Sequence, residues 1–81
     1  MRLLKDFVQD GARISVFHWN NKYLIKLEAG PFEQTFKINE FDLESEDQLH
    51  VLIDNEFISK CMERFSDMAA QLATARRKSE E

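Results

Sequence analysis

The side chains with nucleophilic or metal-binding chemistry in this sequence are one cysteine and two histidines, Cys61, His18 and His50. A catalytic cysteine needs a histidine within hydrogen-bond reach as its base. Cys61 instead falls on an apolar stripe at helical spacing, where a cysteine packs as a small hydrophobic side chain. Neither histidine has a second ligand at a spacing that suits zinc. We therefore expect no catalytic residue, no metal and no cofactor, and the protein is predicted not to be an enzyme.

A run of acidic side chains between residues 40 and 47 raises the question of calcium binding. An EF-hand loop that began at Asp42 would have carboxylates at its first, third and fifth positions. Its sixth position, which needs a turn-forming glycine, would be Asp47, and its twelfth, which needs a bidentate glutamate, would be Ile53. The run is therefore interpreted as a solvated connector that leads into a helix, with Ser45 and Gln48 as its capping box.

The size and composition of the chain predict a single small domain over residues 1–81, with residues 79–81 as a frayed tail. The chain is 43% apolar and 32% charged, which is a globular composition rather than a disordered one. Its net charge of −4 gives no general attraction for nucleic acid or anionic lipid. No apolar run approaches the ~20 residues that cross a membrane, and a lone cysteine is typical of a reducing compartment. We expect a cytoplasmic protein.

Period-two alternation, with one mostly apolar and one mostly polar set of residues, predicts three strands, at about 12–19, 22–29 and 32–39. Asn20-Asn21 and Gly30-Pro31 supply the turns between them, which makes an antiparallel meander. In the first hairpin the register that keeps every apolar residue on one face places Val16 opposite Ile25 and Arg13 opposite Glu28. Glu28 and Glu33 face each other on the outer side of the predicted sheet, where Lys26 is able to offset their repulsion.

The remaining segments are predicted to be helical, which gives an α+β fold with helices packed on one face of the sheet. Residues 1–10 carry Leu3, Leu4, Phe7 and Val8 on one helical stripe, and Gly11 follows as a stop, so a short N-terminal helix is expected. The apolar faces of 46–53 and 55–77 point in different directions, which predicts two helices rather than one. Asp54 is the expected N-cap of the second helix.

The outer face of the predicted sheet is unusually apolar, because Phe17, Trp19 and Leu24 stand where a solvated face should be polar. Three lysines flank them: Lys22, Lys26 and Lys37. Three interpretations remain open. The N-terminal helix covers this face as a second small core, or the face binds another protein, or the aromatic rings and lysines bind single-stranded nucleic acid.

A second candidate surface lies on the long helix, where apolar residues follow a heptad spacing. We call this set the apolar seam: Ile58, Cys61, Phe65, Met68, Leu72 and Ala75. Its first half, Ile58 to Phe65, is expected to pack on the sheet, and beyond Met68 the helix outruns the sheet. Met68, Leu72 and Ala75 are the residues expected to contact a second copy. The sequence therefore predicts a non-enzymatic protein-interaction module, a homodimer or a subunit or adaptor of a larger assembly. Nucleic-acid binding through the aromatic and lysine face is the alternative.

Overall fold

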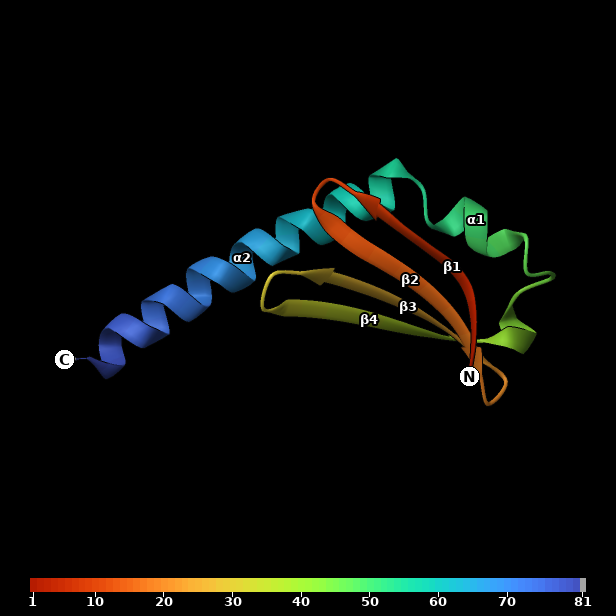
Figure 1. Ribbon diagram of the computed structural model, residues 1–81, viewed down its shortest axis with the longest axis horizontal. Coiled ribbons are helices and arrows are strands. Elements are labelled where there is room, and N and C mark those ends of the chain that lie inside the picture. The colour runs from red at the N-terminus through yellow and green to blue at the C-terminus, as the bar shows by residue number, and fades with distance from the viewer. Residues whose placement is uncertain (81) are drawn as a thin grey trace.

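The computed structural model describes residues 1–80 and contains one four-stranded antiparallel sheet and two α-helices (Figure 1). The strands follow one another in space in the order in which they occur in the chain. The elements are β1 (Arg2–Gln9), β2 (Ala12–Trp19), β3 (Lys22–Ala29), β4 (Phe32–Asn39), the short 3-10 helix η1 (Glu40–Asp42), α1 (Gln48–Leu52) and α2 (Asn55–Ser79). The predicted α+β class is confirmed, with one strand more than expected.

The predicted meander is confirmed, including its register. Val16 pairs with Ile25, and Ile25 pairs in turn with Phe36. The two-residue turn at Asn20-Asn21 has positive φ angles of 50° and 60°, which asparagine adopts more readily than most residues. This register places the apolar residues of β2 and β3 on the face that meets the helices.

The prediction of an N-terminal helix is wrong, because residues 2–9 form the strand β1, paired antiparallel with β2. Asp10-Gly11, with φ angles of 54° and 85°, is a hairpin turn and not a helix stop. The register shifts between Leu3 and Lys5, and the extra residue breaks the alternation within the strand. The four apolar residues of this segment therefore imitate a helical stripe although the chain is extended.

Because residues 1–10 belong to the sheet, the interpretation in which they cover its outer face is also wrong. β1 contributes Leu3 and Val8 to that face, and they are 52% and 73% exposed. Both helices lie on the other side, where the buried core is found (Figure 1). The outer face is therefore open over the part of the chain that the structure describes.

The two-helix prediction is confirmed, since the chain breaks between α1 and α2 at residues 53–54. The Asp54 carboxylate accepts a hydrogen bond from the Phe57 amide at 2.8 Å, as expected of an N-cap. The capping box at α1 forms differently from the prediction. Gln48 accepts from the Glu44 amide through its side-chain oxygen, and Ser45 offers its backbone carbonyl to the Gln48 amide.

The core lies between the inner face of the sheet, α1 and the first half of α2. Its largest fully buried side chains are Ile14, Ile25, Leu27, Leu49, Ile58 and Cys61. The Gln34 side chain donates a hydrogen bond to the Cys61 carbonyl at 2.8 Å and so fixes α2 against β4. Cys61 is 1% exposed, which confirms it as a packed core side chain, and burial raises the pKa of its thiol.

Candidate interaction surfaces

The second half of α2 extends beyond the sheet and forms what we call the helix arm, residues 69–79 (Figure 1). α2 has 25 residues and is therefore about 38 Å long. A strand of eight residues spans only about 27 Å. Every residue of the helix arm is exposed, and the molecule reaches 51 Å along its longest axis. The arm thus presents most of its circumference to solvent.

The apolar seam of α2 divides at Met68, as the sequence predicted. Ile58 and Cys61 are each 1% exposed and Phe65 is 5% exposed, whereas Leu72 is 46% exposed. Met68 packs at the margin of the core, and beyond it the seam continues along the helix arm without a partner in the described chain. A shallow groove runs between this part of the seam and the end of β4, lined by Phe32, Met68, Gln71, Leu72 and Ala75. The structure thus brings together the three seam residues that the sequence selected.

A second apolar surface crosses the outer face of the sheet, and we call it the sheet patch: Leu3, Phe17, Trp19 and Leu24. Leu3 pairs with Phe17, and Phe17 pairs with Leu24, so these three form one row across β1, β2 and β3. Trp19 lies at the end of β2, opposite Lys22, and is 48% exposed. Leu3 was missed by the sequence reasoning. The Asp10-Gly11 turn alone would place Leu3 opposite His18 on the inner face, and only the register shift between Leu3 and Lys5 moves it to the outer face.

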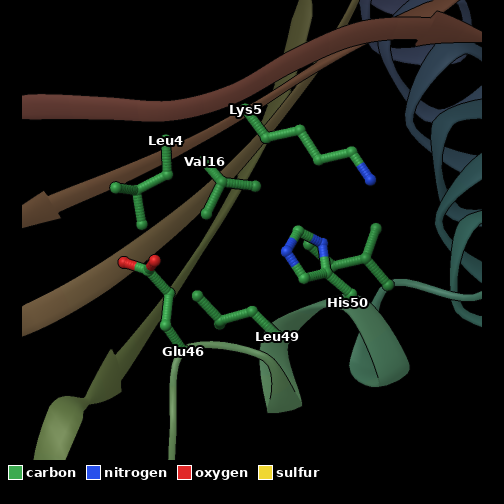
Figure 2. A pocket seen from close by; sticks show the side chains of 7 residues that line it. Leu4, Lys5, Val16, Glu46, Leu49 and His50 are labelled. Atoms are coloured by element: carbon green, nitrogen blue, oxygen red, sulfur yellow. The ribbon is translucent and has the colours of Figure 1, made fainter.

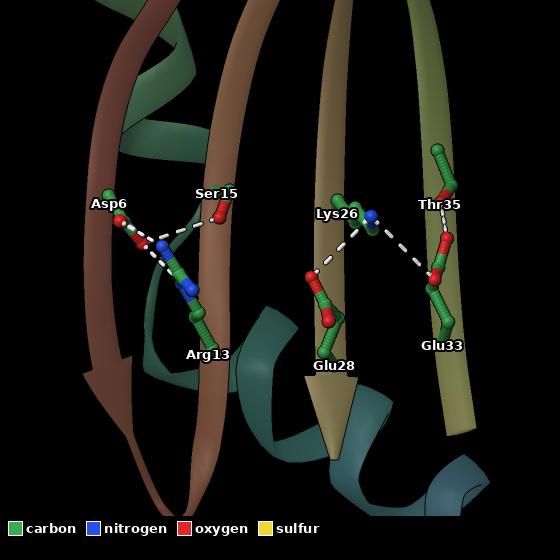
Figure 3. A network of polar contacts seen from close by, with 7 residues as sticks. All are labelled: Asp6, Arg13, Ser15, Lys26, Glu28, Glu33 and Thr35. Atoms are coloured by element: carbon green, nitrogen blue, oxygen red, sulfur yellow. Dashed lines mark hydrogen bonds and ion pairs between the residues drawn. The ribbon is translucent and has the colours of Figure 1, made fainter. Parts of the chain in front are cut away.

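Beside the sheet patch the same face carries two groups of paired charges (Figure 3). In one, the Arg13 guanidinium donates two hydrogen bonds to Asp6, at 2.7 and 3.0 Å, and Ser15 donates a third at 3.3 Å. In the other, the Lys26 ammonium lies 3.5 Å from Glu28 and 3.7 Å from Glu33, which confirms its predicted position between them. The positive charge of Lys26 is therefore already paired with two carboxylates of the same chain.

The Asp6–Arg13 pair predicts a pH dependence of stability. The hydrogen bond that Arg13 donates to the Asp6 carboxylate holds the pKa of Asp6 below the usual value of 3.8. Because the folded-state pKa is lowered, the stabilisation is complete above 3.8 and is lost as the pH falls through the folded value. We expect Asp6→Asn to melt at a lower temperature than the wild type at neutral pH. The difference in Tm should disappear in strong acid, and a difference that persists unchanged there would contradict the assignment.

His18 occupies a structural position in the described chain. The Nε2 atom of His18 lies 2.6 Å from the Glu40 carboxylate, and its ring packs 5.1 Å from that of Tyr23. This contact ties the end of β2 to η1. Within residues 1–80 no group of three or more histidine, cysteine or acidic side chains is arranged to hold a metal ion.

His50 lines the small pocket between α1 and the first two strands (Figure 2). Four apolar and three polar side chains line it: Leu4, Lys5, Val16, Glu46, Leu49, His50 and Ile53. Two of the polar groups have other contacts, because Glu46 pairs with Arg2 at 3.3 Å and the Lys5 ammonium lies 4.9 Å from the centre of the Phe7 ring. The pocket is a gap in the packing of α1 rather than a set of convergent polar groups.

Comparison of this chain with protein-family models, with curated proteins and with solved structures finds no match. Neither α1 nor α2 combines the length and the hydrophobicity that crossing a bilayer requires. The helix arm and the sheet patch are therefore the candidate functional surfaces of this chain.

Proposed function

We propose that this protein is a small non-enzymatic protein-interaction module that self-associates through its helix arm, as a homodimer or within a larger assembly. The observation that carries the proposal is the division of the apolar seam, which is buried up to Phe65 and 46% exposed at Leu72. The part of the apolar seam that lies beyond the sheet has nothing in its own chain to pack against, so it does not stabilise the fold. Burial of that stripe against a second copy would supply the missing contact.

The groove beside the helix arm supports the same proposal. Leu72 and Ala75 line it together with Phe32 of β4, so an entering apolar side chain would touch both the helix and the sheet. The arm also carries small residues, Ala69, Ala73 and Ala75 among them, which allow a second helix to approach closely. In an isologous contact of two arms, Leu72 of both copies would be buried, because two-fold symmetry repeats each contact in the other copy.

The sheet patch is a second surface available to a protein partner. Its aromatic centre with charged neighbours resembles the composition of interface hot spots. The charge arrangement favours protein over nucleic acid, because Lys26 is paired with Glu28 and Glu33 and Asp6 lies on the same face. Lys22 and Lys37 beside the patch give only a small basic area for phosphate contacts.

The test is the self-association of Leu72→Glu, with Thr74→Glu as its matched control. The two variants add the same charge to the same part of the arm, but residues two apart on a helix point about 200° from each other. We expect Leu72→Glu to weaken self-association at least about a hundredfold, because a carboxylate would be buried in an apolar contact. Thr74→Glu should leave it unchanged. Sedimentation velocity over a range of concentrations measures both.

A third variant in the same experiment separates the two surfaces. Trp19→Ala should retain the wild-type association if the helix arm is the contact. If Trp19→Ala lowers the mass and Leu72→Glu does not, then the sheet patch holds the copies together and the proposal for the arm is wrong. Circular dichroism of each variant checks that the fold is intact.

A further inference from the structure

The two edges of the sheet differ in how they are protected. β1 carries the register shift between Leu3 and Lys5 and is flanked by α1 across the small pocket. β4 runs for eight residues without a shift in its pairing with β3, and Pro31 lies in the turn that precedes it. Over the described chain no element lies along its outer edge (Figure 1). Bulges, prolines, covering elements and charged side chains are the devices that keep strand edges from pairing. β4 has no bulge, proline or covering element, and its charged residues, Glu33 and Lys37, are of opposite sign.

The backbone groups that β4 presents at this edge follow from its pairing with β3. The Glu40 amide donates to the Asn21 carbonyl at 3.0 Å, so this pair of residues is a hydrogen-bonded one. Hydrogen-bonded and non-hydrogen-bonded pairs alternate along an antiparallel ladder. The backbone N–H and C=O groups of Glu33, Thr35 and Lys37 are therefore directed away from β3, toward the open edge.

The sequence of β4, Phe-Glu-Gln-Thr-Phe-Lys-Ile-Asn, is complementary to itself in an antiparallel arrangement centred on Thr35. In that register Glu33 of each copy lies opposite Lys37 of the other, and the two Thr35 residues face each other. On the inner side Phe32 lies opposite Ile38, and both are only half-buried in the single chain. A shift by one residue pair places Glu33 opposite Thr35 or Asn39, so the charges select one register.

We propose that β4 pairs edge to edge with β4 of a second copy, in the antiparallel register centred on Thr35, so that two sheets join into one. The contact is isologous, and about six backbone hydrogen bonds would form, two for each facing pair of residues. The proposed pairing rests on the proposed function, because the partner is again a second copy of this chain. The residues that form it are separate from the helix arm. Where both contacts form, the chain builds assemblies larger than either contact alone would give.

The experiment is a charge exchange in full-length protein that also carries Leu72→Glu, which removes the arm contact. Glu33→Lys alone and Lys37→Glu alone each place like charges opposite one another at both ends of the pairing. Each should weaken self-association about tenfold. When the two variants are mixed in equal amounts, every altered charge meets its opposite, so a mixed dimer should form with the strength of the parent. Fluorescence anisotropy of one labelled variant, titrated with the other, measures this.

The outcomes separate this proposal from the one for the helix arm. A mixture that associates no more tightly than either single variant overturns the β4 pairing, and so does a Leu72→Glu parent that stays monomeric. If the wild type associates and that parent does not, the arm contact holds and the edge contact fails. If the parent associates as strongly as the wild type, the arm proposal fails and the edge contact stands.

A second pair of variants tests the backbone contact without changing charge. Thr35→Pro removes an amide that points to the open edge, a position where an edge strand tolerates proline. Thr35→Val keeps that amide and serves as the control. We expect the proline variant to lose edge association in the Leu72→Glu background while its circular dichroism stays unchanged, and the valine variant to retain it. Equal association of the two variants would overturn the proposal.

Discussion

Phe65→Ala is expected to lower the free energy of unfolding by about 3–5 kcal/mol, which is the usual cost of truncating a buried phenylalanine. Phe65 is 5% exposed and belongs to the core between α2 and the sheet. Leu72→Ala, one heptad further along the same seam, should cost less than about 0.5 kcal/mol in the single chain. A domain of this size is stable by only about 4–12 kcal/mol in total, so the first variant removes a large part of its stability.

Urea denaturation at low micromolar concentration measures this contrast, because self-association is then minimal and does not stabilise the folded state by mass action. At high protein concentration, the proposed function predicts a larger loss of unfolding free energy for Leu72→Ala, because the helix arm is then bound to a second copy. Equal losses for the two variants at low concentration would mean that the arm packs on its own sheet in solution. The account of a free arm would then be wrong.

Phe7→Ala is expected to lower the free energy of unfolding by about 2–3 kcal/mol, whereas Val8→Ala next to it should change it by less than about 0.5 kcal/mol. Successive residues of a strand point to opposite faces, so Phe7 packs against the core while Val8 is 73% exposed on the outer face. On a helix the two residues would share one apolar stripe. The ratio of their effects therefore distinguishes the strand β1 from the helix that the sequence suggested.

Thermal and urea unfolding of both variants give the ratio, and leucine at position 7 provides a conservative comparison because Phe7→Leu keeps most of the apolar contact. Similar losses for Phe7→Ala and Val8→Ala would contradict β1 as a strand with one buried face. They would also restore the possibility that the N-terminal segment covers the sheet patch.

The strands β2, β3 and β4 were predictable because three local signals agree. Alternation sets the faces, the Asn20-Asn21 turn sets the offset, and a slip by one residue would expose Ile14 and Ile25. In β1 two signals disagreed. The Asp10-Gly11 turn indicated a hairpin, whereas the apolar spacing of residues 1–10 resembled a helix because the shift between Leu3 and Lys5 disturbs the alternation. The Asp10-Gly11 pair was the stronger signal, because this dipeptide favours a two-residue hairpin turn.

Because the strand β1 was not predicted, its contacts on the candidate surfaces were not predicted either. Arg13 faces Glu28 in the predicted register, but its guanidinium binds Asp6, a partner that only the fourth strand brings within reach. Leu3 joins Phe17 and Leu24 for the same reason. The free end of the apolar seam was predictable, since it follows from the lengths of a helix and a strand. The open edge of β4 was not, because it depends on which strand ends the sheet.

Self-association is best tested by the mass of the wild-type chain in light scattering, from micromolar to near-millimolar protein, at low and at high salt. We expect the mass to rise from 9.6 kDa to at least twice that value as the protein concentration increases. High salt should change the midpoint little, because the apolar arm contact does not depend on exposed charges. A constant mass of 9.6 kDa at every concentration and in both salts would contradict self-association through the helix arm and through the β4 edge.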